Sequence, residues 1–154
     1  MNNLTENKNY LSPTGFKVTI NSNEFANIEY FCTTATLPAL GFSEIATPFR
    51  NVQSFTPGDR LDYGSFDIRF LVSEKMENYI ELYNWIQHNA KEDKIKSSDI
   101  ILHILTSSNN ANKKIRYIDA FPVSIGAVEF ITQTTDVEYV SVDASFRYTL
   151  FEFI

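Results

Sequence analysis

Residues 63–72 read YGSFDIRFLV and change polarity at almost every step. Side chains of a strand point alternately to the two faces of a sheet, so a period of two predicts a strand with one apolar face. The apolar side chains are Phe66, Ile68, Phe70 and Val72, and the opposite face carries Ser65, Asp67, Arg69 and Leu71. The chain is therefore expected to build its core on one side of a β-sheet.

The C-terminal residues repeat this period over a longer run and predict a strand from Glu138 to Phe151. One face holds Val140, Val142, Ala144, Phe146, Tyr148 and Leu150, and the other holds Ser141, Asp143, Ser145, Arg147 and Thr149. Because one face is polar, this strand is expected to be buried on one side only.

Five shorter runs predict further strands, at residues 15–20, 28–35, 99–105, 114–121 and 127–132. The polar turn at 107–112 joins the third and fourth into a hairpin. Pro122 is expected to end the fourth, because proline cannot donate to a strand ladder.

Between the strands the apolar period changes to three and four, which predicts one amphipathic helix from Lys75 to Asn89. The expected buried stripe is Met76, Ile80, Tyr83 and Ile86 or Gln87, widened by Tyr79, Leu82 and Trp85. Ser73 is the expected N-cap.

The expected architecture is mainly β, a sandwich or partly open barrel with one packed α-helix. A chain of 154 residues fits a single domain, here over 13–154, preceded by a flexible arm at 1–12 that is rich in Asn, Lys and Glu. Aromatic residues make up 14% of the chain, which is ample material for a compact core and excludes disorder of the whole chain.

Residues 41–62, GFSEIATPFRNVQSFTPGDRLD, contain turn-forming Pro48, Pro57 and Gly58 and yet carry several large apolar side chains. These are Phe42, Ile45, Phe49, Val52 and Phe55. A solvated loop has no use for them, so the segment either folds back over the core as a twisted hairpin or is an arm that buries them against a partner.

The run Pro57-Gly58-Asp59-Arg60 also has two interpretations. It is either a turn that leads into the strand at Tyr63 or the hinge of a projecting arm, with Arg60 paired to an acidic neighbour. Spacing alone favours the turn.

The charge and cysteine content exclude several classes of protein. Nineteen acidic against thirteen basic side chains give a net charge of −6, which disfavours sequence-specific DNA binding. The single Cys32 cannot form an internal disulfide and fits a reducing compartment. No signal-peptide run or stretch of eighteen apolar residues occurs, so a protein that is soluble and not exported by that route is expected.

No residues form a convincing catalytic or metal-binding motif. Cys32 with His88 or His103 could act as nucleophile and base, but Cys32 and His103 lie in predicted strands and a packed thiol is favoured. The acidic pairs Asp59 with Asp62 and Asp136 with Glu138 fit turns better than acid–base catalysis. With five glycines and no phosphate loop, no catalytic, cofactor or metal residues are expected, and the protein is not expected to be an enzyme.

A series of short motifs in a fixed order resembles a known family. They are FCTTATLPA at 31–39, Phe49, PGDR at 57–60, YNW at 83–85, AFPVSIG at 120–126 and the terminal strand from Val137 to Glu152. Together they resemble the tail tube protein of contractile-tailed (myovirus) bacteriophages over most of the chain. Residues 1–12 and 109–113 contribute nothing to the resemblance.

The resemblance implies a structural virion protein whose hexameric rings stack into a tube that conducts genomic DNA during ejection. A contractile sheath would surround the tube, baseplate and terminator proteins would lie at its ends, and the subunit would assemble in the host cytoplasm. The apolar residues of 41–62, with Asp59 and Arg60, would form an inter-ring arm. The expected lumen-facing residues are Ser65, Asp67, Ser141, Asp143, Ser145 and Thr149, whose acids would repel DNA phosphates. Arg69 and Arg147 on the same faces fit an acidic lining poorly.

Other functions remain open on the sequence alone. A tube initiator or baseplate component would show nearly the same pattern, and so would a tube subunit of a bacterial contractile-injection or secretion system. A small-ligand or carbohydrate-binding β module is the alternative from another class, and it would stay monomeric where a tube subunit forms rings or filaments.

Overall fold

A computed structural model describes residues 10–21, 32–133, 136 and 138–154. The predicted arm at 1–12 and the predicted strand at 28–35 lie partly outside these residues. The described elements are β1 (Phe16–Ile20), β2 (Cys32–Ala35), β3 (Leu40–Pro48), β4 (Gln53–Tyr63), β5 (Phe66–Leu71), α2 (Glu77–Lys91), β6 (Ser98–Leu105), β7 (Ala111–Ile125), β8 (Ser141–Arg147) and β9 (Leu150–Phe153).

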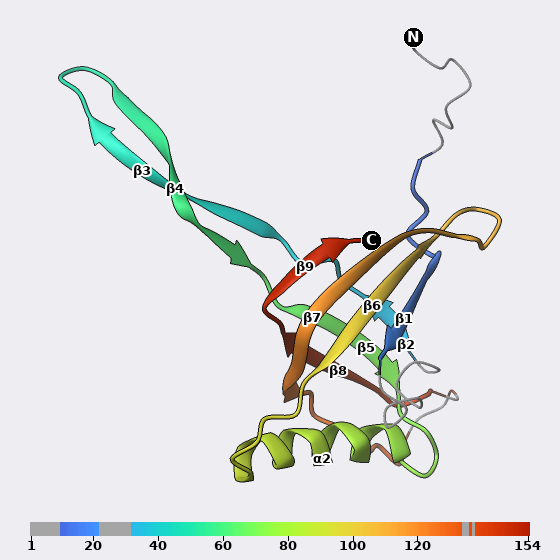
Figure 1. Cartoon of the computed structure of the whole chain (residues 1–154). Helices are drawn as coiled ribbons and strands as arrows, with labels where there is room; N and C mark the ends of the chain where they lie inside the picture. Colours follow the sequence, from blue (N-terminus) through green and yellow to red (C-terminus); the bar gives the residue numbers. More distant parts are fainter. Residues whose placement is uncertain (1–9, 22–31, 134–135, 137) are drawn as a thin grey trace.

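Seven of the strands form one antiparallel sheet in the order β1-β6-β7-β8-β5-β2, with β9 also paired to β7. The long β7 bends at Asp119, whose φ is 53°. Up to Ala120 β7 pairs with β6 and β9, and from Phe121 onward it pairs with β8. The sheet therefore folds into two leaves that enclose the core, with α2 packed across one end (Figure 1). Among the described residues β1 and β2 are not paired, so the barrel stays open, as predicted.

The core between the leaves is built on the predicted apolar faces. Phe66 and Phe70 of β5 are fully buried, and Phe66 stacks on Tyr117 of β7 with ring centroids 4.4 Å apart. The ring centroid of Phe146 in β8 lies 6.0 Å from that of Trp85 in the helix. The period-two pattern at 63–72 is thus confirmed as a strand with one buried face over residues 66–71, while Tyr63 ends β4.

The helix was predicted correctly, but its buried stripe only in part: Leu82 and Trp85 of the predicted stripe are buried, and Ile80 and Tyr83 are not. Asn78, Leu82 and Trp85 face the sheet, whereas Ile80 and Tyr83 are about half exposed. Successive helical residues are rotated by about 100°, so a stripe through 78, 82 and 85 leaves position 80 on the opposite side. The pattern contained enough apolar residues for two stripes, and packing against the sheet selected one of them.

The start of the helix also differs from the prediction. Met76, in a left-handed conformation with φ 57°, occupies the N-cap position in place of Ser73. The Ser73 hydroxyl still accepts a hydrogen bond from the Glu77 N–H at 3.0 Å. The buried Asn78 donates to the Leu71 carbonyl at 2.6 Å, and this bond ties the helix to the end of β5.

The predicted C-terminal strand is interrupted. It forms β8 and β9 with a break at residues 148–149, because β8 pairs with β5 and β7 in one leaf while β9 pairs with the first half of β7 in the other. The Thr149 N–H donates to the Ile118 carbonyl in that break, at 3.0 Å. One alternating pattern therefore serves two leaves.

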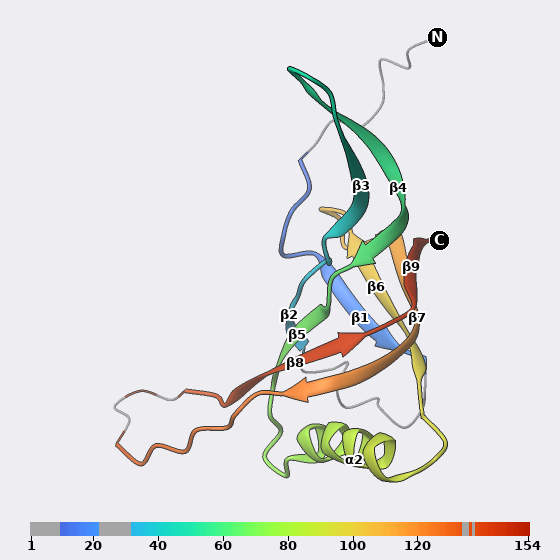
Figure 2. The same ribbon diagram turned by 90° about the vertical axis from the view of Figure 1, so that its left-hand side faces the viewer.

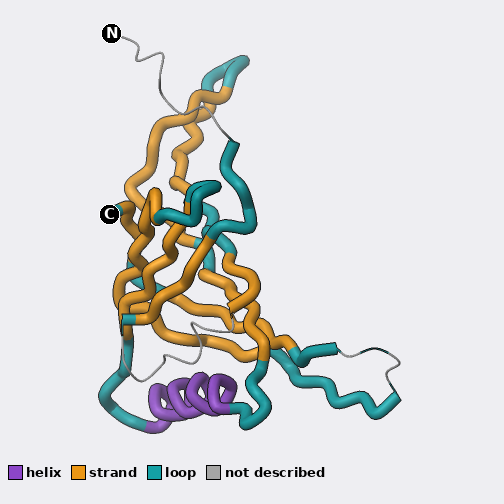
Figure 3. The backbone as a smooth tube through the Cα atoms, turned by 90° about the vertical axis from the view of Figure 1, so that its right-hand side faces the viewer, coloured by secondary structure: helices purple, strands orange, loops and turns teal. Residues whose placement is uncertain are grey.

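Two predictions around Pro122 are wrong. The strand β7 continues through Pro122 to Ile125. At Pro122 β7 is no longer paired with β6 or β9 and has β8 as its one partner. The N–H that proline lacks is therefore not needed on the open side of the strand. Residues 127–132 form no strand, because after Ile125 the chain leaves the sheet and forms the loop that extends from the body in Figures 2 and 3.

Candidate functional site

The first candidate surface is the hairpin of β3 and β4, called here the arm. Figure 1 shows the arm extending away from the rest of the molecule, so it does not fold over the core. Its apolar side chains remain 56–69% exposed: Phe42, Ile45, Phe49, Val52 and Phe55. So many large exposed apolar side chains on one projecting hairpin are typical of an interaction site.

A β-bulge divides the arm. The register changes between Phe42 and Glu44, so that Ser43 lies opposite Gly58 to Arg60. A Cβ atom on Gly58 would overlap the Ser43 hydroxyl and lie 2.8 Å from the Ser43 carbonyl oxygen, so only glycine fits there. The run 57–60 is therefore a bulged part of β4, whereas spacing favoured a turn. Asp59 and Asp62 likewise lie on this strand, exposed, and not in turns.

Arg60 is held by its backbone, whose N–H donates to the Ser43 hydroxyl at 3.1 Å. Within the described part of the chain no carboxylate pairs with its guanidinium. The predicted pairing with an acidic neighbour is therefore not made inside the described subunit.

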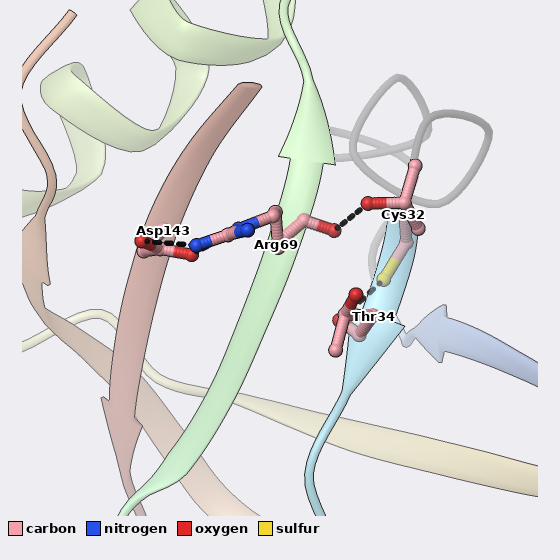
Figure 4. Close-up of polar contacts among 5 residues, drawn as sticks. Cys32, Thr34, Arg69 and Asp143 are labelled. Carbon is pink, nitrogen blue, oxygen red and sulfur yellow. Dashed lines mark hydrogen bonds and ion pairs between the residues drawn. The ribbon is translucent and has the colours of Figure 1, made fainter. Parts of the chain in front are cut away.

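The second candidate surface is the polar face of β2, β5 and β8, on the side of the sheet away from the core. Ser145 donates to an Asp67 carboxylate oxygen at 2.6 Å, and Ser65 lies 3.4 Å from the other oxygen. Arg69 pairs with Asp143 through two hydrogen bonds, of 2.7 and 3.1 Å (Figure 4). Four of the predicted lumen residues thus lie together on one face.

The Arg69–Asp143 pair changes the expected charge of this face. The neighbouring guanidinium lowers the pKa of Asp143, and the carboxylate raises the pKa of Arg69. Both side chains are more than half exposed, so the pair is screened by water and adds little to stability. On this face Asp143 neutralises Arg69, and Asp67 keeps its negative charge, so an arginine can lie among the predicted lumen residues without presenting an unpaired cation.

The remaining predicted lumen residues have different positions. Ser141 is exposed opposite Leu71 and lies on the same outward face of β8 as Asp143 and Ser145, beyond the Arg69–Asp143 pair. Thr149 lies in the break before β9 and does not belong to the face. Arg147, at the end of β8, donates to the Tyr63 carbonyl at 3.4 Å. Thr34 and Thr36 line the same hollow as Asp67 and Asp143 but were missed, because no local pattern reveals that β2 lies beside β5.

Cys32 and the two histidines form no catalytic group. The thiol donates to the Thr34 carbonyl at 3.4 Å, and burial raises the pKa of Cys32 to about 11. Nε2 of His103 lies 3.2 Å from the Thr19 hydroxyl, and His88 is exposed near the end of α2. A thiol with a raised pKa is a poor nucleophile. Among the described residues no three His, Cys, Asp or Glu side chains gather as a metal site would require.

The third candidate surface is an apolar groove where β5 leads into the helix. It is lined mainly by Leu71, Val72, Met76, Phe130, Tyr139 and Val140. The exposed acids Glu74 and Glu138 also line it. The Val72 N–H donates to the Val140 carbonyl at 2.8 Å, which holds the two walls together. Over the described residues, no helix has the length and apolarity needed to cross a membrane.

No protein-family model and no curated protein sequence matches the chain. Solved structures do match its fold. The tube-terminating cap of the anti-feeding prophage (AFP) has a TM-score of 0.73 at 16% identity, with 100% of this chain and 99% of the cap chain covered. A chain of the PVC sheath–tube complex, from an extracellular contractile injection system in its extended state, has a TM-score of 0.71 at 12% identity, with 96% and 93% covered.

A third match is Hcp1 from Flavobacterium johnsoniae, with a TM-score of 0.57 at 13% identity and coverage of 90% of this chain and 93% of Hcp1. The chain therefore has the Hcp-like tube fold of contractile injection systems, as the resemblance predicted. These similar proteins are structural parts of injection systems and not enzymes.

Proposed function

We propose that the protein is a structural subunit that assembles with copies of itself into the tube of a contractile injection system. The arm is the observation that carries this proposal: five large apolar side chains lie more than half exposed on a hairpin that extends from the body. Burying such surface against a second copy is favourable by roughly 25 cal/mol per Å². The tube fold makes an identical subunit the natural partner.

The assembly would need two kinds of contact. A lateral head-to-tail contact closes into a ring, proposed to hold six copies, and an axial contact through the arm stacks the rings. The open strand edges of the sheet are available for lateral pairing. A sheath outside the tube and baseplate and terminator proteins at its ends are the further partners proposed.

The polar face is the proposed lining of the tube. Hydroxyl groups, two acids and a neutralised guanidinium offer no cluster of cations for phosphate groups to bind, so a nucleic acid would slide without sticking. This proposal has two versions. In the first, the tube is part of a virion tail, assembles in the host cytoplasm and conducts DNA. In the second, it belongs to a bacterial injection system and conducts the cargo of that system.

A second candidate function is a component at the end of a tube. It is favoured by the match to the AFP cap, in which practically the whole of both chains is covered. A repeating subunit should form long tubes, whereas an end component should stop at single or double rings or bind the end of a tube made by another protein.

The test is electron microscopy of the purified chain over a range of concentrations, with analytical ultracentrifugation alongside. Rings and stacked tubes are expected to increase with concentration. Single rings that never stack would favour the end component. A chain that stays monomeric, both alone and with a preformed baseplate, would contradict assembly and favour a ligand-binding module.

A further inference from the structure

Resting on the proposed self-assembly, we infer that the end of the arm of one subunit docks in the apolar groove of a second copy in the next ring, with Arg50 paired to Glu138 there. The end of the arm, called here the tip, is residues 49–52. It carries one cation, Arg50, between two exposed apolar side chains, Phe49 and Val52. A bond from the Phe49 N–H to the Val52 carbonyl, at 2.9 Å, closes the tip.

The groove offers the complementary surface. Its apolar lining lies beside two acids, Glu74 and Glu138, and the adjoining hollow adds Glu129. Its volume is about 550 Å³, within the range of sites that enclose a small apolar group. The tip thus presents apolar side chains around one cation, and the groove presents apolar walls beside acids. Such complementary charges are typical of a specific protein contact.

The groove is also firmly built on one wall. The buried Asn78 side chain donates to the Leu71 carbonyl at 2.6 Å, and its oxygen accepts from the Ser73 N–H at 3.2 Å. These bonds fix the backbone between β5 and the helix before any partner arrives. A preformed site loses less conformational freedom when it binds.

The positions of tip and groove require two different copies. Figures 1 and 2 place the tip at one end of the molecule and the helix, with the loop that follows β7, at the other. A tip cannot reach the groove of its own subunit. A second copy displaced along the line from groove to tip would bring its groove to the tip of the first. Nine residues of β3 span about 30 Å at roughly 3.4 Å per residue, enough to overlap a neighbouring subunit. Repetition of this contact gives an open stack.

The experiment exchanges the charges of the proposed pair and measures the critical concentration for tube formation by sedimentation and microscopy. Arg50→Glu and Glu138→Lys should each raise it more than about tenfold, because like charges then meet in a docked contact. The double variant should recover most of the loss. Lys94→Glu, an exposed position in the loop after α2 and outside both the arm and the groove, is the control and should stay within about twofold of the unmodified chain.

A cross-link tests the contact independently of tube yield. In a Cys32→Ser background, Phe49→Cys with Tyr139→Cys should oxidise to a ladder of linked subunits, since each chain carries both partners. Phe49→Cys with Phe153→Cys, at the 62% exposed last residue of β9, should not. Circular dichroism checks that each variant is folded.

The results separate the two proposals. Tubes that tolerate Arg50→Glu, or a double variant no better than its parents, would overturn the docking contact and leave the tube function standing. Cross-linking that stops at a closed ring would also overturn it, because the tip would then bind a neighbour within the ring. An unmodified chain that never assembles would refute the tube function, and the cross-link at high concentration would still decide whether tip and groove meet.

Discussion

The body and the arm use the same kinds of side chain for opposite purposes. Phe66 and Phe146 are fully buried between the leaves of the sheet, whereas Phe49 and Phe55 on the arm are 64% and 56% exposed. Both regions are β-structure and both read as apolar. The difference is that the body has a second layer to cover its rings, and the arm has only its own two strands.

This contrast shows what hydrophobicity alone can mean. An apolar side chain in the body stabilises the subunit, because folding removes it from water. An apolar side chain on the arm contributes little to folding and becomes useful when another surface covers it. Substitutions in the body should therefore change the free energy of unfolding of the isolated subunit much more than substitutions on the arm.

Truncating a core ring should have the largest effect. Phe66→Ala is expected to lower the free energy of unfolding by about 3–5 kcal/mol, since it removes a stacked, fully buried ring and leaves a cavity. The matched change on the arm, Phe55→Ala, should cost less than about 0.5 kcal/mol. Urea unfolding of the monomer measures both, and equal losses would contradict the division.

A change within the core should stabilise the protein. The Tyr117 hydroxyl is buried without a hydrogen-bond partner among the described residues, and burial raises the pKa of Tyr117. Tyr117→Phe is expected to raise the free energy of unfolding by about 1 kcal/mol, because it removes an unpaired polar group.

The neighbouring Tyr148 is the control for that change. Its hydroxyl donates to the Gly64 carbonyl at 2.7 Å, so Tyr148→Phe should lower stability by about 1 kcal/mol. Chemical denaturation of both variants should give opposite signs, and a loss in both would show that Tyr117 has a partner in solution.

Removing the apolar surface of the arm should leave the subunit folded and stop its assembly. The triple variant Phe49→Ser, Val52→Ser, Phe55→Ser is expected to keep the free energy of unfolding within about 0.5 kcal/mol at each site, since all three side chains are exposed. Ultracentrifugation should show no stacked rings. Ile95→Ser, at a position 67% exposed outside the arm, is the control that should still stack. Unfolding of the triple variant would mean that these side chains belong to the subunit's own core.

The smallest effect concerns the exposed pair on the polar face. Arg69→Gln should move the pKa of Asp143 upward toward about 3.9, the value of an unperturbed carboxyl group. Because the folded pKa is lowered, the pair's small contribution to stability exists above the unfolded pKa and is lost as pH falls through the folded value. Carbon-13 NMR titration of Asp143 measures the shift. An unchanged pKa would show that the ion pair does not form in solution.

Several features could be predicted from local sequence because they depend on neighbours two to four residues apart. The alternation at 63–72 and the buried faces of β5 and β8 are of this kind, as is the presence of a helix after β5. The grouping of Asp67, Asp143 and Ser145 followed from the polar faces of the two strands. Their pairing with one another did not, because strand order is not written in any local period.

The failures share one cause. Each of them depends on which element lies alongside. This holds for the break at 148–149, for the passage of β7 through Pro122 and for the exposure of Ile80 on the helix. Thr34 and Thr36 were missed for the same reason, since β2 joins the polar face only through its pairing with β5.

The amino-acid pattern by itself determined that the protein is a mainly β domain with one amphipathic helix, and that residues 41–62 carry more apolar side chains than a loop can use. These are properties of short segments, set by side-chain period and composition. Only the tertiary structure decided that the segment extends away from the body, and that an acid-lined groove forms at the other end of the molecule. Both depend on contacts between residues far apart in the chain, which no local pattern encodes.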